Sequence, residues 1–167
     1  CRPPKSFVKP GTDVTAMSAL FIDHLSLIGD LSKEQIEILR PLFNEVRYDK
    51  NKVIFYQGQE AKHIYFVVEG EVAIRFKPDD GPLLTVAEVG PGDVFGWSSA
   101  VGSSSYTSSA VCTQKGMFLQ LEGEKLKRVC EKYPDTGILI LDRLAGVIAQ
   151  RLKGTHEQVL ALLHRGL

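Results

Sequence analysis

The sequence predicts a mainly β domain with flanking helices, namely an antiparallel β-roll of the jelly-roll type followed by one long C-terminal helix. Three observations support this prediction. Between Glu45 and Glu122 apolar residues alternate with polar ones in short runs, and turn signals such as Asp-Gly separate the runs. From about Thr136 to His164 the apolar period becomes that of a helix. With 167 residues, of which 44% are hydrophobic, the chain is long enough for one globular domain and a helical extension.

The first elements are an arm and a short helix. Residues 1–16 are rich in Pro, Lys, Ser and Thr and show no periodicity, which predicts an extended N-terminal arm. The stretch LSKEQIEILRPLF predicts a short helix, because Ser32 and Gln35 have the spacing of a capping box and Pro41 limits the length. The apolar residues expected on one face of this helix are Ile36, Leu39 and Phe43.

The strands of the roll follow in sequence. VRYDKNKVIFYQGQ predicts two short strands joined at Asp49–Asn51. HIYFVVEGEVAIRF is interpreted as a hairpin with Glu69–Gly70 at its corner, and PDDGPL is expected to close a second hairpin into LLTVAEV. VGPGDVFG predicts another tight turn, and TSSAVCT and GMFLQLE supply the last strands. We therefore expect residues 17–134 to form one unit of helix and β-roll.

Two helices are expected after the roll. GEKLKRVCEKY predicts a short amphipathic helix that ends before Pro134, and residues 135–167 predict one long helix. Apolar residues in the long helix recur at alternating steps of three and four over about three and a half heptads, which favours a homodimer through this helix. The alternative is that the stripe packs on its own β-domain. The residues of this seam are Ile138, Leu141, Ala145, Ile148, Leu152, Thr155, Val159 and Leu162.

The composition argues against several classes of function. The 20 basic and 20 acidic side chains cancel and no basic run occurs, so we expect no nucleic-acid contact by this segment itself. No apolar run approaches the roughly 20 residues of a membrane span, and the three cysteines lack metal-site spacing, which fits a reducing, cytoplasmic compartment. The four histidines form no metal-binding pair, and no nucleophile–base arrangement is visible. We expect no metal, no cofactor and no enzymatic activity.

Four segments, taken in order, carry a family resemblance. They are LSKEQIEIL, then IFYQGQEAKHIYFVVEGEVAI with turn glycines at Gly58 and Gly70, then PGDVFG ending at Gly96, and finally AQRLKGTHEQV. This set resembles the cyclic-nucleotide-binding domain, the sensor module of cAMP-receptor/Fnr-type regulators, of cyclic-nucleotide-gated channels and of kinase regulatory subunits. The resemblance covers about residues 20–165. It implies a β-roll whose phosphate-binding cassette begins at Gly96 and whose C-terminal helix dimerises.

The cassette departs from the family pattern at its two charged positions. In the family a Glu directly after the glycine accepts a hydrogen bond from the ribose, and an Arg further on neutralises the phosphate. Placed without gaps, these positions hold Trp97 and Thr107 here, and no Lys or Arg lies between Val94 and Cys112. We therefore expect a regulatory sensor module of the cAMP-receptor/Fnr type that does not bind cAMP or cGMP in the usual way.

Three interpretations of this cassette stay open. Trp97 can be a stacking platform for another small-molecule effector, with hydroxyl and backbone N–H groups as neutral partners. The pocket can be vestigial, which leaves a dimerisation module, or the domain can be a genuine cyclic-nucleotide binder. Thr155 matches the family position that contacts the purine, although a polar seam residue can also set helix register. The candidate ligand-binding residues are Phe95, Gly96, Trp97, Ser98, Ser99, Thr107, Ser108 and Thr155. In a transcription regulator a DNA-binding output domain would follow Leu167.

Overall fold

The computed structural model describes residues 22, 25, 27 and 31–166, and the side chains of residues 155, 156 and 158–166 are outside the description. The predicted arm, residues 1–16, lies outside the described residues as well. The named elements are α2 (Lys33–Leu39), the 3-10 helix η2 (Arg40–Leu42), β1 (Phe43–Tyr48), β2 (Val53–Phe55), β3 (His63–Phe76), β4 (Leu84–Val89), β5 (Val94–Phe95), the 3-10 helix η3 (Trp97–Val101), β6 (Ser109–Glu122), α3 (Gly123–Lys132) and α4 (Pro134–Gly166).

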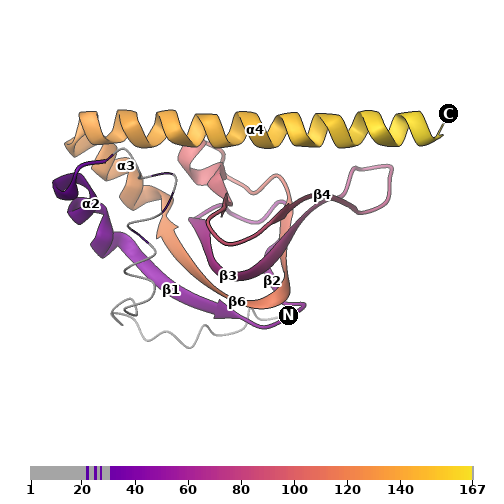
Figure 1. Ribbon diagram of the computed structural model, residues 1–167, viewed down its shortest axis with the longest axis horizontal. Coiled ribbons are helices and arrows are strands. Elements are labelled where there is room, and N and C mark those ends of the chain that lie inside the picture. Colours follow the sequence, from indigo (N-terminus) through magenta and orange to yellow (C-terminus); the bar gives the residue numbers. More distant parts are fainter. Residues whose placement is uncertain (1–21, 23–24, 26, 28–30, 167) are drawn as a thin grey trace.

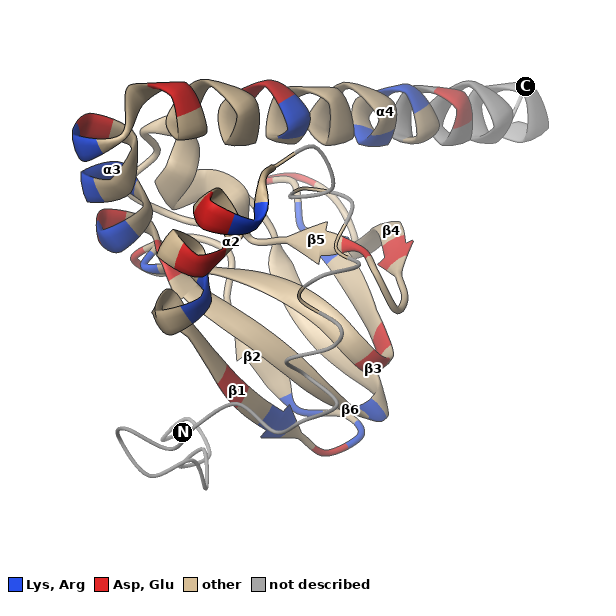
Figure 2. Cartoon of the chain, turned by 60° about the vertical axis from the view of Figure 1, so that its left-hand side comes forward, with Lys and Arg blue, Asp and Glu red and all other residues tan. Residues whose placement is uncertain are grey.

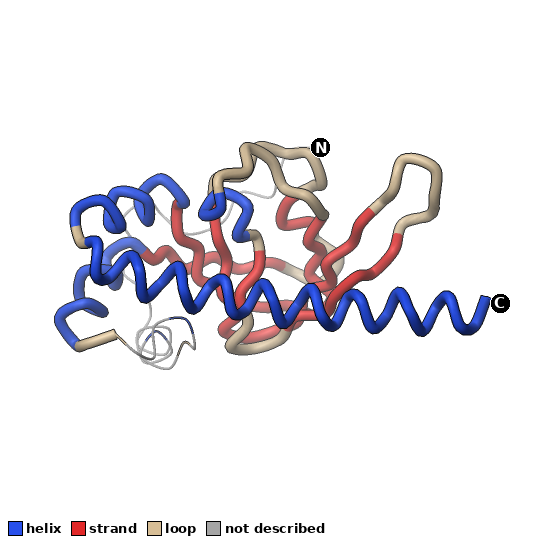
Figure 3. Tube along the Cα trace, turned by 90° about the horizontal axis from the view of Figure 1, so that it is seen from above, coloured by secondary structure: helices blue, strands red, loops and turns tan. Residues whose placement is uncertain are grey.

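The strands form one curled antiparallel sheet beneath the long helix. The order is β1-β6-β3-β4, with β2 paired to β6 and β5 paired to β3. Figure 1 shows α4 running along one side of this roll, with α2 and α3 packed at one end. Seen from above, α4 crosses the strands and continues beyond them at the end opposite α2 and α3 (Figure 3). The predicted β-roll followed by a long C-terminal helix is confirmed.

Two predicted strand boundaries inside the roll are wrong. Strand β3 is one continuous strand of 14 residues rather than a hairpin, and β6, also 14 residues, replaces the two strands expected at the end of the roll. Gly70, placed at the corner of the predicted hairpin, has φ 95° and lies opposite Gly116, where the β3–β6 register shifts. The positive φ of Gly70 therefore bends a continuous strand at a bulge instead of reversing the chain.

The leading helix begins as predicted and ends sooner. Ser32 Oγ accepts a hydrogen bond from the Gln35 backbone N–H at 3.2 Å, and Gln35 Oε1 accepts one from the Ser32 N–H at 2.9 Å, which completes the capping box. The α-helix ends at Leu39, and the proline-containing turn η2 leads directly into β1. Phe43 is therefore the first residue of β1 and not part of the helix face.

The hydrophobic core has two parts. One fills the roll and is rich in aromatic residues, including Phe55, Tyr65 and Phe118. The other lies between the roll and the helices, and α4 contributes Ile140 and Leu144 to it. These two side chains are 1% exposed each, so α4 is held on the roll by its own apolar face.

A second set of apolar residues on α4 is largely exposed. Ile138, Leu141 and Leu152 are 66%, 42% and 65% exposed, and Ala145 is exposed between them. Ile148 is only partly buried and packs against the core, so this one seam residue also serves the roll. The side chains of Thr155, Val159 and Leu162 are outside the described part of the chain. Most of the predicted seam that the structure describes is therefore exposed rather than packed in its own core.

Charge and hydropathy on the surface agree with the composition. Lys and Arg residues are interspersed with Asp and Glu along α2, α3 and α4 in Figure 2. Within the part of the chain that is described, no helix is long and apolar enough to cross a membrane.

Candidate functional site

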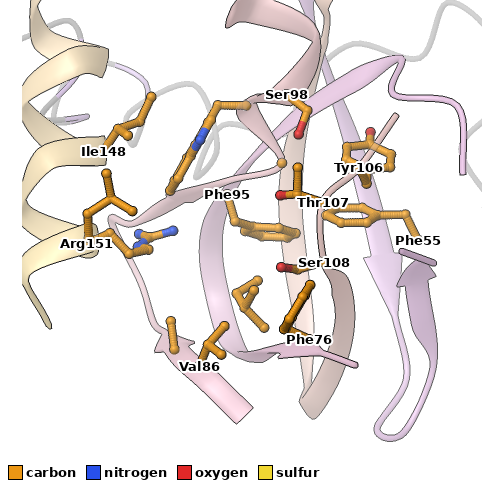
Figure 4. Close-up of a pocket in the computed structure, with 15 residues that line it drawn as sticks. Phe55, Phe76, Val86, Phe95, Ser98, Tyr106, Thr107, Ser108, Ile148 and Arg151 are labelled. Carbon is orange, nitrogen blue, oxygen red and sulfur yellow. The ribbon is translucent and has the colours of Figure 1, made fainter. Parts of the chain in front are cut away.

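A cavity of about 370 Å³ lies between the roll, the η3 segment and α4. Figure 4 shows its side chains converging from these three sources. Its size falls within the range of small-molecule sites in proteins, about 300–1,000 Å³. The residues that line it are Phe55, Ile74, Phe76, Val86, Ala87, Phe95, Gly96, Trp97, Ser98, Tyr106, Thr107, Ser108, Ile148, Arg151 and Leu152.

The turn after β5 aims the first cassette residues at the cavity. Gly96 has φ 73°, and a Cβ on it would lie 3.1 Å from the Phe55 ring, so both conformation and space favour glycine there. The chain then forms the short helix η3, and Gly102, which follows its last residue as the C-cap, is also left-handed, with φ 84°. The Ser103 N–H donates to the Ser98 carbonyl at 2.9 Å and closes this turn. Trp97 and Ser98 are thereby held at the edge of the cavity.

The floor of the cavity is a packed set of aromatic rings. Phe55 and Tyr106 stack with centroids 3.7 Å apart, and Phe95 stacks on Tyr65 at 5.2 Å. The Tyr106 hydroxyl donates to the His63 carbonyl at 2.7 Å and accepts from the His63 N–H at 3.1 Å. Burial raises the pKa of Tyr106, so its hydroxyl stays neutral at physiological pH. The floor is therefore mainly apolar toward a ligand, since the Tyr106 hydroxyl is bonded to the His63 backbone and the Tyr65 hydroxyl to Tyr48.

The cavity contains a cation that the cassette itself lacks. Arg151 reaches in from α4, and the centre of its guanidinium lies 4.7 Å from the centroid of the Trp97 ring. Burial lowers the pKa of Arg151 and the Asp93 carboxylate raises it, but a guanidinium remains protonated in either case. The cassette is uncharged as the sequence indicated, and Arg151 adds to the cavity a charged group that the sequence analysis did not name.

Comparison with known proteins places this geometry in a family. The model of the family described as "Cyclic nucleotide-binding domain" matches residues 45–133, which cover the roll and α3. The chain belongs to the cyclic-nucleotide-binding domain family. The match covers more than half of the chain and includes β5, η3 and the segment up to β6, which carry the cassette residues.

Individual relatives support a regulatory domain of the cAMP-receptor type. The "Cyclic AMP receptor protein" of Thermus thermophilus is 29% identical over 127 residues, which are 76% of this chain and 57% of the relative. The "Global nitrogen regulator" of a Synechocystis strain is 29% identical over 122 residues, 72% of this chain and 52% of the relative. This cyclic-nucleotide-binding domain thus spans about half the length of the curated relatives it matches.

A solved structure shows the same fold. The crystal structure of a cyclic nucleotide-binding domain from Methylobacillus flagellatus superposes with a TM-score of 0.75 at 20% identity, covering 85% of this chain and 80% of that one. At this identity the likeness concerns the fold alone.

The structure brings together most of the predicted ligand-binding residues of this cyclic-nucleotide-binding domain. The six that line the cavity are Phe95, Gly96, Trp97, Ser98, Thr107 and Ser108. Ser99 lines a different cavity, beside His63 and Glu122, and its buried Oγ has no hydrogen-bond partner among the described residues. The Thr155 side chain lies outside the described part, so its predicted role remains a prediction.

Sequence reasoning assigned Thr155 of α4 to the ligand site but missed Ile148, Arg151 and Leu152. Arg151 follows Ile148 by three residues and precedes Thr155 by four, so the three positions lie on one side of the helix. That spacing was the available signal, because Thr155 had already been assigned to the ligand site and Arg151 lies one helical turn before it. Phe55 and Tyr106 were missed too, since only the fold brings these segments under the cassette.

The site of this cyclic-nucleotide-binding domain is equipped for binding. Among the lining residues that the structure describes, Arg151 is the one charged side chain, and the others are apolar or carry single hydroxyls. Within the same part of the chain, no three His, Cys, Asp or Glu side chains lie together as a metal site. The arrangement can enclose a mainly apolar molecule and present one cation to it.

Proposed function

We propose that this domain is the effector-sensing part of a transcription regulator of the cAMP-receptor type. Its effector occupies the cavity between the roll and α4 and is recognised differently from a cyclic nucleotide. The observation that carries this proposal is the shared wall of the cavity, because the cassette supplies Trp97 and Ser98 while α4 supplies Ile148, Arg151 and Leu152. A molecule that contacts both parts binds with an affinity that depends on the position of α4, so its binding biases that position.

The two family positions for ribose and phosphate support a departure from cyclic-nucleotide chemistry. Trp97 stands where the family has the Glu that accepts from the ribose hydroxyl, and its indole lines the cavity. Thr107 stands where the family has the phosphate-binding Arg. A charge-assisted hydrogen bond to an anion contributes about 1.5–3 kcal/mol, so loss of that Arg alone weakens phosphate binding roughly 10- to 100-fold.

A second candidate function is cyclic-nucleotide binding itself. Two observations favour it, namely a relative whose name is "Cyclic AMP receptor protein" and the cation that Arg151 adds to the cavity. Calorimetric titration with cAMP and cGMP separates the two candidates. Binding at micromolar concentration or tighter supports the cyclic-nucleotide function, whereas no heat at millimolar nucleotide supports an effector of another class.

The proposed function is tested by thermal-shift measurements against a set of small metabolites, with a variant that fills the cavity. Ala87 lines the cavity from β4, and Ala87→Trp would place an indole in it. Glu88, the next residue along the strand, is exposed, so Glu88→Trp adds the same side chain on the other face. A compound that raises the melting temperature of wild type and Glu88→Trp but not of Ala87→Trp supports the proposal. If no compound stabilises wild type, or if every stabiliser also stabilises Ala87→Trp equally, the proposal is wrong.

We also propose that the regulator is a homodimer through the exposed seam of α4. The double variant Ile138→Glu/Leu141→Glu would bury charges in such an interface. The control Gln150→Glu adds a charge on the other side of the same helix. Sedimentation velocity should show a dimer for wild type and Gln150→Glu and a monomer for the double variant. A monomeric wild type at tens of micromolar, or a double variant that stays dimeric, would contradict this interface.

A further inference from the structure

We infer that the effector is a flat, largely apolar monoanion, with an aromatic carboxylate as the type. Its charged group binds Arg151 of α4, and its ring lies between Trp97 and the aromatic floor. This inference rests on the proposed function, because it concerns the same cavity, and it adds the chemical class of the ligand.

The first step is the polarity of the cavity wall. The described lining consists mainly of aromatic and aliphatic side chains, and its hydroxyls come from Ser98, Thr107, Ser108 and Tyr106. The Tyr106 hydroxyl is already bonded to the His63 backbone. A sugar or polyol would bring more donors and acceptors into this space than the wall can pair, and each unpaired polar group costs binding free energy. An apolar body avoids that cost.

The second step is the shape of the apolar space. Phe55 and Tyr106 stack on each other, and Phe95 stacks on Tyr65, so this part of the cavity wall is built of packed aromatic rings. Trp97 adds an indole from the cassette. Aromatic surfaces favour flat rings over bulky aliphatic groups, since offset stacking and edge contacts add to burial.

The third step is the charge. Arg151 is half-buried, the described lining contains no carboxylate, and Asp93, outside that lining, is a carboxylate that acts on the guanidinium. A cationic ligand would therefore meet a like charge at short range, and a neutral ligand would make no ionic contact. A guanidinium has several N–H donors, so its planar fork can bind a ligand carboxylate while Asp93 still acts on it. A guanidinium can also keep its face on an indole while it donates through its edge, so ligand binding does not require Arg151 to leave Trp97.

The fourth step is the relative placement of these groups. Figure 4 shows the Arg151 guanidinium entering from the α4 side, while the Thr107 and Ser108 hydroxyls lie farther from α4, above and below the Phe95 ring in this view. A ring over Phe95 thus directs one substituent toward α4 and another toward the two hydroxyls. The anionic substituent belongs at the α4 end, where the cation lies.

The experiment uses Trp97 as the reporter, because it is the one tryptophan in the chain. Its indole N–H gives a single resonance in a nitrogen–proton correlation spectrum of labelled protein, and this resonance is followed during titration. The probes are naphthalene-2-carboxylate and its neutral analogue naphthalene-2-carboxamide, with cAMP as a third probe. They are compared in wild type, in Arg151→Gln and in Arg143→Gln, which removes an exposed arginine from the same helix.

Wild type and Arg143→Gln should bind the carboxylate about 10- to 100-fold more tightly than the carboxamide. In Arg151→Gln the two probes should bind within about threefold of each other. Each preference is a ratio within one variant, so a general loss of stability in Arg151→Gln would not imitate the result. Arg151→Lys, which keeps the charge without the fork, should retain part of the preference.

Three outcomes would overturn the inference. Equal binding of both naphthalene probes to wild type would leave an effector cavity without anion selectivity, and the proposed function would stand. Failure of both probes would exclude the flat apolar class, and the metabolite screen would then decide the proposed function separately. Tighter binding of cAMP than of the carboxylate would assign the site to cyclic nucleotides.

Discussion

The bend shared by β3 and β6 depends on Gly70, and Gly70→Ala tests it directly. The residue has φ 95°, a conformation that costs an alanine about 1–3 kcal/mol. An added Cβ would lie 2.7 Å from Gly116 Cα and 2.9 Å from the carbonyl oxygens of Gln114 and Lys115. These are backbone atoms, so relief requires one strand to move, and overpacking of this kind costs about 1–3 kcal/mol. The expected loss in unfolding free energy is therefore about 2–6 kcal/mol.

The assay is urea unfolding followed by far-ultraviolet circular dichroism at 25 °C. With an m-value of about 2 kcal/mol per M, the smallest expected loss lowers the midpoint by about 1 M. Gly146→Ala is the matched control, because Gly146 is an exposed glycine of α4 and a Cβ added to it would have nothing within 4 Å. That change should stabilise the protein by about 0.4–1 kcal/mol. A Gly70→Ala protein within about 0.5 kcal/mol of wild type would refute the account of the bend.

Three further predictions concern side chains of the roll. Tyr106→Phe keeps the stack on Phe55 but removes the hydroxyl that donates to the His63 carbonyl at 2.7 Å. The unfolding free energy should therefore fall by about 1–2 kcal/mol. An unchanged urea midpoint would contradict this. Burial lowers the pKa of His63, so the unfolded chain takes up this proton at a higher pH than the folded protein does. The unfolding free energy should therefore fall as the pH drops below about 6.5. In His63→Gln the urea midpoint should depend less on pH in that range. Burial raises the pKa of the Cys112 thiol, and its Sγ donates to the Gln114 carbonyl. Iodoacetamide should therefore leave Cys112 unmodified in the native protein and label it in urea. Peptide mass spectrometry measures this labelling.

Local signals in the sequence were sufficient for most of the fold. The Ser32–Gln35 capping box, the proline limits of the helices and the change of period after Glu122 all act over a few residues, and each one appears in the structure. The Asp-Gly turn before β4 also joins two strands that pair with each other. Such features are set by the residues that display them, so a single sequence is enough to find them.

The errors arose where distant segments meet. Gly70 has the signature of a hairpin corner when it is viewed alone, but Gly116 lies opposite it and the two strands stay paired on both sides of the bend. The cavity poses the same difficulty, because Phe55, Tyr106 and Arg151 come from three segments that only the closed roll and the packed helix bring together. Ile148 illustrates the limit on α4 itself, since its seam spacing is real while its side chain also packs on the roll.

The position of the cation changes how binding and signalling are connected. Where a cassette carries its own arginine, the charge of a ligand is neutralised inside the roll, and the long helix is needed only for additional contacts. In this protein the cassette has no Lys or Arg, and the cation of the cavity, Arg151, lies on α4 instead. For the inferred anionic effector, the ionic part of the binding free energy is therefore available only when α4 stays close to the roll. An interaction of about 1.5–3 kcal/mol that exists in one helix position and not in another shifts the equilibrium between them roughly 10- to 100-fold. Arg151→Gln should thus weaken the effect of a bound anion on α4 more than it weakens the binding of a neutral analogue.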